Sequence, residues 1–261
     1  MRIVRFRTKN NRVSFGILNE ETITLIDGEI LGRFNKTKET VLLNDVKLLA
    51  PIIPPNLLAL GMNYSEHAKE GGASLPKAPV LFIKTTTTIT DPDSDVILPK
   101  MAPNNVDYEA ELAIIIGKTA KNVSEAKAHE YVLGYTCAND VSARDCQGGD
   151  LQWARGKCFD TFAPLGPWIE TELDPDKCNI ILRLNGKTMQ NADTSQLIFN
   201  TRYIISYLSD CMTLLPGTII LTGTPSGVGF ARKPPVWLKE GDIMEVEIEG
   251  IGILKNKVVK E

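Results

Sequence analysis

The stretch Asp107-Tyr-Glu-Ala-Glu-Leu-Ala-Ile-Ile-Ile-Gly117 ends in an apolar run, Leu112–Ile116, which suits a buried strand and is far too short to cross a bilayer. Side chains two apart in a strand point to the same face, so Glu109 and Glu111 are expected to stand together. Like charges at that distance repel, and a cation relieves the repulsion. Carboxylates without His or Cys select a hard ion such as Mg²⁺, Mn²⁺ or Ca²⁺. An exposed edge strand with an acidic wet face explains the same spacing, and spacing alone leaves both interpretations open.

Strand-like segments recur along the rest of the chain, and few helical segments accompany them. The segments are LLALG, APVLFIK, YEAELAIIIG, VLGYTCAN, NIILRLNG, TIILTG and IMEVEIEGIG. Helices are expected at 124–131, with Ser124 as N-cap, and at 200–211. One face of the second helix carries Ile204, Ile205, Leu208 and Cys211. Because the strands outnumber the helices and do not alternate with them, the pattern predicts an α+β fold rather than a doubly wound parallel sheet.

The first 50 residues read as short strands separated by polar turns, with no helical period. They are followed by Pro-Ile-Ile-Pro-Pro-Asn at 51–56, a stiff segment that disfavours helix. We therefore expect a small β-rich N-terminal module at 1–50 and a main domain at 55–261.

Composition narrows the classes of partner. A chain of 261 residues with 43% hydrophobic residues and a net charge of -3 resembles an ordinary globular protein and offers no basic surface for nucleic acid or an anionic membrane. The cationic start is not followed by the apolar segment of a secretory signal. Five cysteines without a CxxC pair predict free thiols in a reducing compartment, so a cytoplasmic location is expected.

A second polar segment, Ala-Asn-Asp-Val-Ser-Ala-Arg-Asp-Cys-Gln at 138–147, follows a strand-like run. If it is helical, Asp140, Arg144 and Gln147 fall on one face. An acid, a guanidinium and an amide placed together could complete a metal site and grip a carboxylate. A helix cap at Asn139 or Asp140, with an ion pair to Arg144, explains the spacing equally well.

A short helix with Ser65 as N-cap and Gly71 as its end would carry His67 and Glu70 three residues apart. The carboxylate could then orient the imidazole and raise its basicity, as in a general base. A pair of surface charges has the same spacing.

Two further segments carry candidate binding groups. Lys157 stands among small and apolar residues, where burial could make it functional. The loop Leu-Thr-Gly-Thr-Pro-Ser-Gly-Val-Gly at 221–229 follows an apolar strand and can present main-chain N–H groups to an anion. It lacks the Gly-Lys-Ser/Thr ending of a P-loop and does not match Gly-x-Gly-x-x-Gly, so the sequence gives little support for nucleotide binding.

The order of these segments resembles the fumarylacetoacetate-hydrolase family. The strings that carry the resemblance are NYSEHAKE, PVLFIK, DYEAELAIIIGK, ANDVSARDCQ, GKCFDTFAPLGP, TGTPSGVG and KPPVWLKEGD. Seven ordered motifs cover about residues 55–258. Met62, FDTFAPLGP and KPPVWLKEGD look more like the branch associated with oxaloacetate tautomerisation and 2-hydroxyhepta-2,4-diene-1,7-dioate isomerisation, because the acylpyruvate-cleaving branch commonly has arginine at the Met62 position.

The resemblance implies a mixed β-roll or β-sandwich with a few short helices, usually assembled as a homodimer, and a 2-oxo acid substrate. It implies Mg²⁺, or Mn²⁺, as the cofactor. The implied metal ligands are Glu109, Glu111 and Asp140. The implied substrate-binding residues are Arg144, Gln147, Gly223 and Thr224. Lys157 would meet the substrate beside the metal, and His67 with Glu70 would form a catalytic dyad on a mobile lid.

Several reactions fit such a site, because one metal-stabilised enolate serves them all. Activated water would cleave a β-diketo acid, as in acylpyruvate hydrolysis; proton transfer alone would give tautomerisation or isomerisation; loss of CO₂ would give oxaloacetate decarboxylation. A non-catalytic binding protein on the same fold would be expected to have lost the carboxylates or the dyad. A glycosidase is disfavoured, because Glu109 and Glu111 are neighbours on one strand face.

Overall fold

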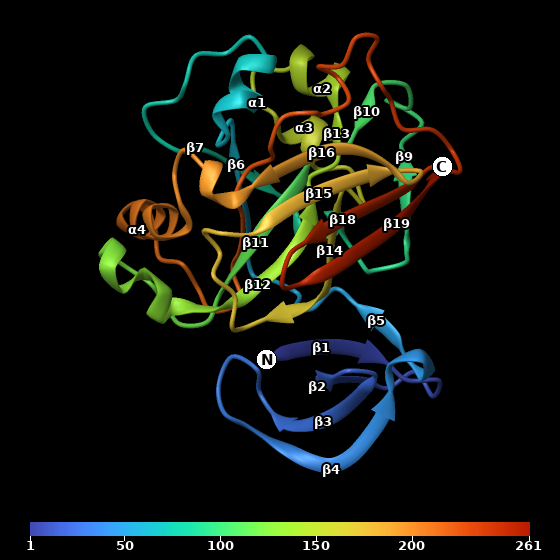
Figure 1. Cartoon of the computed structure of the whole chain (residues 1–261), viewed down its shortest axis with the longest axis vertical. Helices are drawn as coiled ribbons and strands as arrows, with labels where there is room; N and C mark the ends of the chain where they lie inside the picture. Colours follow the sequence, from blue (N-terminus) through green and yellow to red (C-terminus); the bar gives the residue numbers. More distant parts are fainter.

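The computed structural model describes residues 1–261, and most of its regular structure is strand (Figure 1). The strands of the first half are β1 (Arg2–Arg7), β2 (Val13–Asn19), β3 (Thr22–Gly28), β4 (Phe34–Leu42), β5 (Lys47–Leu49), β6 (Leu57–Gly61), β7 (Val80–Lys84), β8 (Ile89–Thr90), β9 (Asp95–Leu98), β10 (Val106–Asp107) and β11 (Ala110–Ile116). Those of the second half are β12 (Val132–Asn139), β13 (Ser142–Ala143), β14 (Ala163–Glu170), β15 (Asn179–Leu184), β16 (Lys187–Asp193), β17 (Ile219–Leu221), β18 (Ile243–Ile248) and β19 (Gly252–Lys260). The predicted α+β fold dominated by strands is confirmed.

Helices are short and few. The α-helices are α1 (Ser65–Glu70), α2 (Arg144–Gly149), α3 (Ala154–Lys157) and α4 (Thr201–Cys211), and the 3₁₀ turns are η1 (Leu43–Asp45), η2 (Thr86–Thr88), η3 (Glu125–Tyr131) and η4 (Thr194–Gln196). The helix expected at 124–131 is thus a 3₁₀ helix, and Ser124 makes no side-chain cap. Helix α4 lies where predicted and is capped by Asn200, but Cys211 at its end is exposed rather than packed. None of these helices is long and apolar enough to cross a membrane.

The largest sheet runs in the order β4-β3-β2-β1-β14-β12-β11-β17-β6-β7, and a smaller sheet in the order β16-β15-β18-β19-β9 packs against it. Strand β11 lies inside the large sheet, between β12 and β17. Its side chains alternate between two cores: Leu112 and Ile114 face the larger one, whereas Ala113 and Ile115 face the second. Burial on both faces explains why this strand is an unbroken apolar run.

The N-terminal strands continue the large sheet and also enclose a core of their own. Strand β1 pairs with β14, with Ile3 opposite Ile169. A separate cluster contains Val4, Phe6, Leu18, Ile23 and Leu25. In Figure 1 these blue strands lie below the rest of the molecule, away from helices α1, α2 and α3.

Candidate active site

Three carboxylates meet at one end of the central strands. Glu109 directly precedes β11, Glu111 lies in it, and Asp140 directly follows β12. The pairing of Ala110 with Asn139 brings the ends of the two strands together. One oxygen from each carboxylate lies within 4.8 Å of the others, and all three residues are buried. The alternative of an exposed acidic edge strand is therefore wrong.

Two buried lysines neutralise part of this charge. The Lys157 ammonium donates to Glu109 Oε2 at 2.8 Å and to Asp140 Oδ2 at 2.6 Å. Lys84, the last residue of β7, donates to Asp140 Oδ1 at 2.5 Å and also to the main-chain oxygen of Lys157. Sequence reasoning missed Lys84, and the available signal was a lysine ending an otherwise apolar strand.

Arg144 connects the carboxylates to helix α2. Its guanidinium donates to Glu109 Oε1 and to Asp107 Oδ1, both at 2.6 Å, and to Gln147 Oε1 at 2.9 Å. The helix begins at Arg144, so the prediction that Asp140 shares a helical face with Arg144 and Gln147 is wrong. Residues 142–143 instead form a strand that pairs with Val106–Asp107. The alternative, a helix cap at Asn139 or Asp140 with an ion pair to Arg144, is also wrong, because the N-cap is Ala143 and Arg144 pairs with Asp107 and Glu109.

The helix that carries the histidine covers this cluster. His67 Nδ1 lies 2.9 Å from Glu70 Oε1, so the expected pair is present, and both side chains are largely buried. Glu70 Oε2 accepts a second hydrogen bond, at 2.9 Å, from the N–H of Gly227. The N-cap residue is Tyr64 rather than Ser65, and no side chain caps the helix.

The Gly-rich loop after β17 lies against the carboxylate strand. The N–H of Gly223 donates to Glu111 Oε2 at 2.6 Å, so this group orients a carboxylate of the cluster. The hydroxyl of Thr224 donates to the main-chain oxygen of Ala110 at 2.9 Å. Gln190, a buried residue that sequence reasoning did not single out, donates to Thr224 Oγ1 at 2.7 Å.

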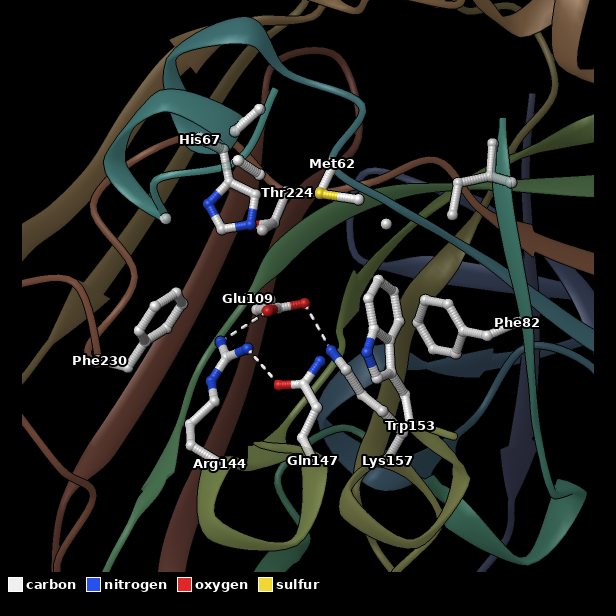
Figure 2. A pocket seen from close by; sticks show the side chains of 15 residues that line it. Met62, His67, Phe82, Glu109, Arg144, Gln147, Trp153, Lys157, Thr224 and Phe230 are labelled. Carbon is white, nitrogen blue, oxygen red and sulfur yellow. Dashed lines mark hydrogen bonds and ion pairs between the residues drawn. The ribbon is translucent and has the colours of Figure 1, made fainter. Parts of the chain in front are cut away.

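These groups surround a cavity of about 160 Å³ (Figure 2). It is lined by Leu60, Gly61, Met62, His67, Ala68, Gly71, Ala73, Phe82, Glu109, Arg144, Gln147, Trp153, Lys157, Thr224 and Phe230. Six of the predicted site residues thus line the cavity. The other four do not line it but contact a residue of the site: Glu70 pairs with His67, Asp140 with Lys157, and Gly223 with Glu111. Phe82 and Trp153 form an apolar wall, with ring centroids 5.4 Å apart.

Burial and charge act in opposite directions on the ionisable groups. Burial raises the pKa of Glu111 well above its usual range, and the charges of Asp140 and Glu109 add to the rise. For Glu109, burial also acts to raise the pKa, but the cationic Lys157 and Arg144 outweigh it and hold the pKa below its usual value. Burial disfavours the Lys157 ammonium, yet the neighbouring carboxylates outweigh this effect and raise its pKa.

The donor set fits a hard divalent cation. All three groups are carboxylates, and no nitrogen or sulfur ligand joins them. Glu111 has one hydrogen bond, from Gly223, to one of its oxygens, which leaves its other oxygen available to an ion. Protein charges alone leave Glu111 repelled by two neighbouring carboxylates, and a cation would remove that repulsion.

A strand-built core that holds a cavity lined by buried, mutually paired ionisable groups is the architecture of an enzyme. The Fumarylacetoacetate (FAA) hydrolase C-terminal family model matches residues 56–259, and a second model, Rv2993c-like, N-terminal, matches residues 1–51. The chain therefore belongs to the fumarylacetoacetate hydrolase family, as its sequence motifs predicted.

Named relatives extend this result. The chain is 46% identical over 222 residues to a mitochondrial oxaloacetate tautomerase of Bos taurus, covering 83% of this chain and 70% of the relative. Among solved structures it is similar to a 5-carboxymethyl-2-hydroxymuconate delta-isomerase of Mycobacterium smegmatis, with 41% identity, a TM-score of 0.91 and full coverage of both chains. A 2-hydroxyhepta-2,4-diene-1,7-dioate isomerase of Mycobacterium marinum gives 41% identity and a TM-score of 0.90, covering 100% of this chain and 99% of the other. The expected likeness to the tautomerase and isomerase branch is confirmed.

Proposed function

We propose that this enzyme moves a proton in a small 2-oxo acid, with oxaloacetate as the leading substrate, and that it requires Mg²⁺ or Mn²⁺ held by Glu109, Glu111 and Asp140. The observation that carries the proposal is the buried carboxylate cluster, within 4.8 Å and directly behind a small cavity. The names of the tautomerase and isomerase relatives support the reaction type. Such an ion, when bound, supplies Lewis-acid stabilisation of negative charge on the substrate's 2-oxygen.

The chain's own cations and amides would hold the acid. Arg144 has three N–H groups committed to Asp107, Glu109 and Gln147, and the guanidinium has two more to offer. The amide nitrogen of Gln147 donates to no group of the chain and lies at the cavity. These donors suit a carboxylate.

The proton transfer is assigned to His67. Glu70 holds Nδ1, which leaves Nε2 as the nitrogen that can take a proton from substrate C3 and return it to the 2-oxygen. Lys157, which contacts two of the carboxylates, would keep the oxygens of the site neutralised while the charge moves.

Hydrolysis of an acylpyruvate is the second candidate, because the same His67–Glu70 pair could activate water. The apolar wall of Phe82 and Trp153, next to Met62, would accommodate an acyl chain.

The deciding experiment is a substrate comparison. Purified enzyme is assayed with oxaloacetate, acylpyruvates and 2-hydroxydienoates, each with EDTA and then with added Mg²⁺ or Mn²⁺. Metal-dependent enol–keto conversion of oxaloacetate without release of pyruvate or CO₂ supports the proposal. Release of a carboxylic acid from an acylpyruvate favours the hydrolase, release of CO₂ favours the decarboxylase, and activity that persists in EDTA excludes the metal requirement.

We also propose a division into an N-terminal module at 1–50 and a catalytic domain at 55–261, a homodimeric assembly and a cytoplasmic location. Light scattering at micromolar concentration tests the assembly, since a monomer alone would contradict it. The location is tested by cell fractionation, because the oxaloacetate tautomerase of Bos taurus is named mitochondrial.

A further inference from the structure

Gln190 joins the two sheets at the site. It lies on β16 in the small sheet and is only 1% exposed. Its Oε1 accepts from the N–H of Ala110 at 2.9 Å, and its Nε2 donates at 2.7 Å both to Thr224 Oγ1 and to the main-chain oxygen of Pro225. One amide thus binds the carboxylate strand and the Gly-rich loop at the same time.

This arrangement commits the hydroxyl of Thr224. A hydroxyl has a single hydrogen, and here it goes to the main-chain oxygen of Ala110 while the oxygen accepts from Gln190. The hydroxyl therefore has no hydrogen left for a ligand. The main-chain N–H of Thr224 donates to no other group of the chain, whereas that of Gly223 is taken by Glu111. Thr224 lines the cavity, so its main-chain N–H is the group it can offer to an anion.

The family resemblance already implies Thr224 as a substrate-binding residue. We propose that Gln190 is the positioning residue of this contact, and that the contact is made by the main-chain N–H of Thr224 rather than by its hydroxyl. The inference rests on the proposed function in one respect: the anion is the carboxylate of a 2-oxo acid. Ala110 stands between Glu109 and Glu111, so the Gln190 amide also fixes the distance from the anion contact to the carboxylate cluster. A main-chain donor needs such support, because it moves with its loop.

Calorimetry with pyruvate as the probe, at saturating Mg²⁺, separates this arrangement from a direct contact by the hydroxyl. Gln190→Met removes all three hydrogen bonds at nearly constant volume, and Thr224→Val removes the hydroxyl. Each should raise the Kd for pyruvate about tenfold, the effect of one lost hydrogen bond to a charge. The double variant should be no weaker than either single variant, because both act through one contact.

Thr224→Ser keeps the hydroxyl and should bind like the wild type. Asn191→Ala, next to Gln190 on β16 and exposed, is the control for changes in that strand. If Thr224→Val weakens binding while Gln190→Met does not, the hydroxyl itself holds the anion and the proposal is overturned. Should Gln190→Met fail to fold, Gln190→Glu, which keeps the acceptor for Ala110 and loses both donors, replaces it.

Hydrogen exchange gives a readout that does not depend on any ligand. Gln190→Met should speed exchange in residues 222–229 and leave α4 unchanged. Unchanged exchange in the loop would overturn the role of Gln190. If wild-type enzyme does not bind pyruvate, the proposed anion contact fails, whereas the proposed function is decided by the assays with oxaloacetate. The exchange experiment still decides whether Gln190 positions the loop.

Discussion

The carboxylate cluster and the helix above it are built in different ways. The cluster with its lysines, which we call the floor, is assembled from the ends of β7, β11, β12 and helix α3. Its charges are held by several short hydrogen bonds. The lid, helix α1, is a six-residue helix without a side-chain cap. It is attached to the Gly-rich loop through Glu70 and the N–H of Gly227, and at its start through Asn63, whose side chain bonds Phe199 and Thr222.

The difference separates two tasks. A fixed floor can hold a metal and an acid in one geometry, which any reaction through an enolate needs. We expect a short helix attached at a few points to open when substrate enters and to carry the group that determines the reaction. Floor variants should therefore fail with every substrate, while lid variants should distinguish between substrates.

The largest effect is expected from the floor. Asp140→Asn removes a proposed metal ligand and leaves the ammonium groups of Lys84 and Lys157 without their shared acid. Loss of a residue that hydrogen-bonds to a metal ligand reduces metal affinity or activity about 10- to 100-fold. Loss of the ligand itself should therefore reduce both more than about 100-fold. Mg²⁺ titration calorimetry and activity with oxaloacetate and an acylpyruvate provide the measurements. Asp145→Asn, on exposed α2 surface, is the matched control. Retained Mg²⁺ affinity in Asp140→Asn would remove it from the metal site.

The lid variant His67→Ala should affect the candidate reactions to different extents. If the enzyme cleaves carbon–carbon bonds, loss of the general base should lower kcat at least about 100-fold. Decarboxylation needs no activated water, so that activity would persist. Tautomerisation should fall between these limits. Mg²⁺ affinity should not change, because the lid supplies no carboxylate to the cluster. Small, equal effects on oxaloacetate and acylpyruvate would show that the pair has no part in catalysis.

The sequence made much of this site predictable, because some of its signals are local. Strand periodicity placed Glu109 and Glu111 together, and helical spacing placed His67 beside Glu70. The meeting with Asp140 depends on a strand register, Ala110 opposite Asn139, which no local pattern encodes.

Pairing between segments far apart in the chain also explains what the sequence predicted wrongly and which site residues it did not reveal. One interpretation of the sequence made the segment before Arg144 helical, but Ser142 and Ala143 pair with Val106–Asp107, and a strand there excludes the helix. Lys84 is the one polar residue of β7, whereas Gln190 is one of several polar residues in β16, and their partners lie 56 and 34 residues or more away in the chain. Only the folded structure shows what they bind.

Lys84 tests whether the floor depends on partners beyond the metal ligands. Lys84→Met keeps the length of the side chain and leaves Asp140 with one ammonium instead of two. We expect metal affinity to fall about 10- to 100-fold, the range for loss of a group that orients a ligand. Calorimetry with Mg²⁺ measures this without substrate. Lys84→Arg restores the charge, and partial recovery of affinity would show that charge matters, whereas equal loss in both variants would point to packing. Unchanged affinity would remove Lys84 from the floor.

The smallest effect is expected where the lid is attached. Glu70→Gln keeps the shape of the side chain and an oxygen that can still accept from the Gly227 N–H, so the helix should stay in place. It loses the charge that orients His67, and a neutral partner forms a weaker hydrogen bond. We therefore expect kcat to fall about tenfold, less than for His67→Ala, because the base remains present. Glu66→Gln, on the exposed side of the same helix and paired only with Lys69, is the control and should leave kcat unchanged. If Glu70→Gln lowers kcat as far as His67→Ala does, and if the double variant is no worse, the two residues work as a unit rather than as a base with an orienting partner. If it raises KM and leaves kcat unchanged, Glu70 serves mainly to close the lid on the Gly-rich loop, and orientation of His67 then has to come from elsewhere in the helix.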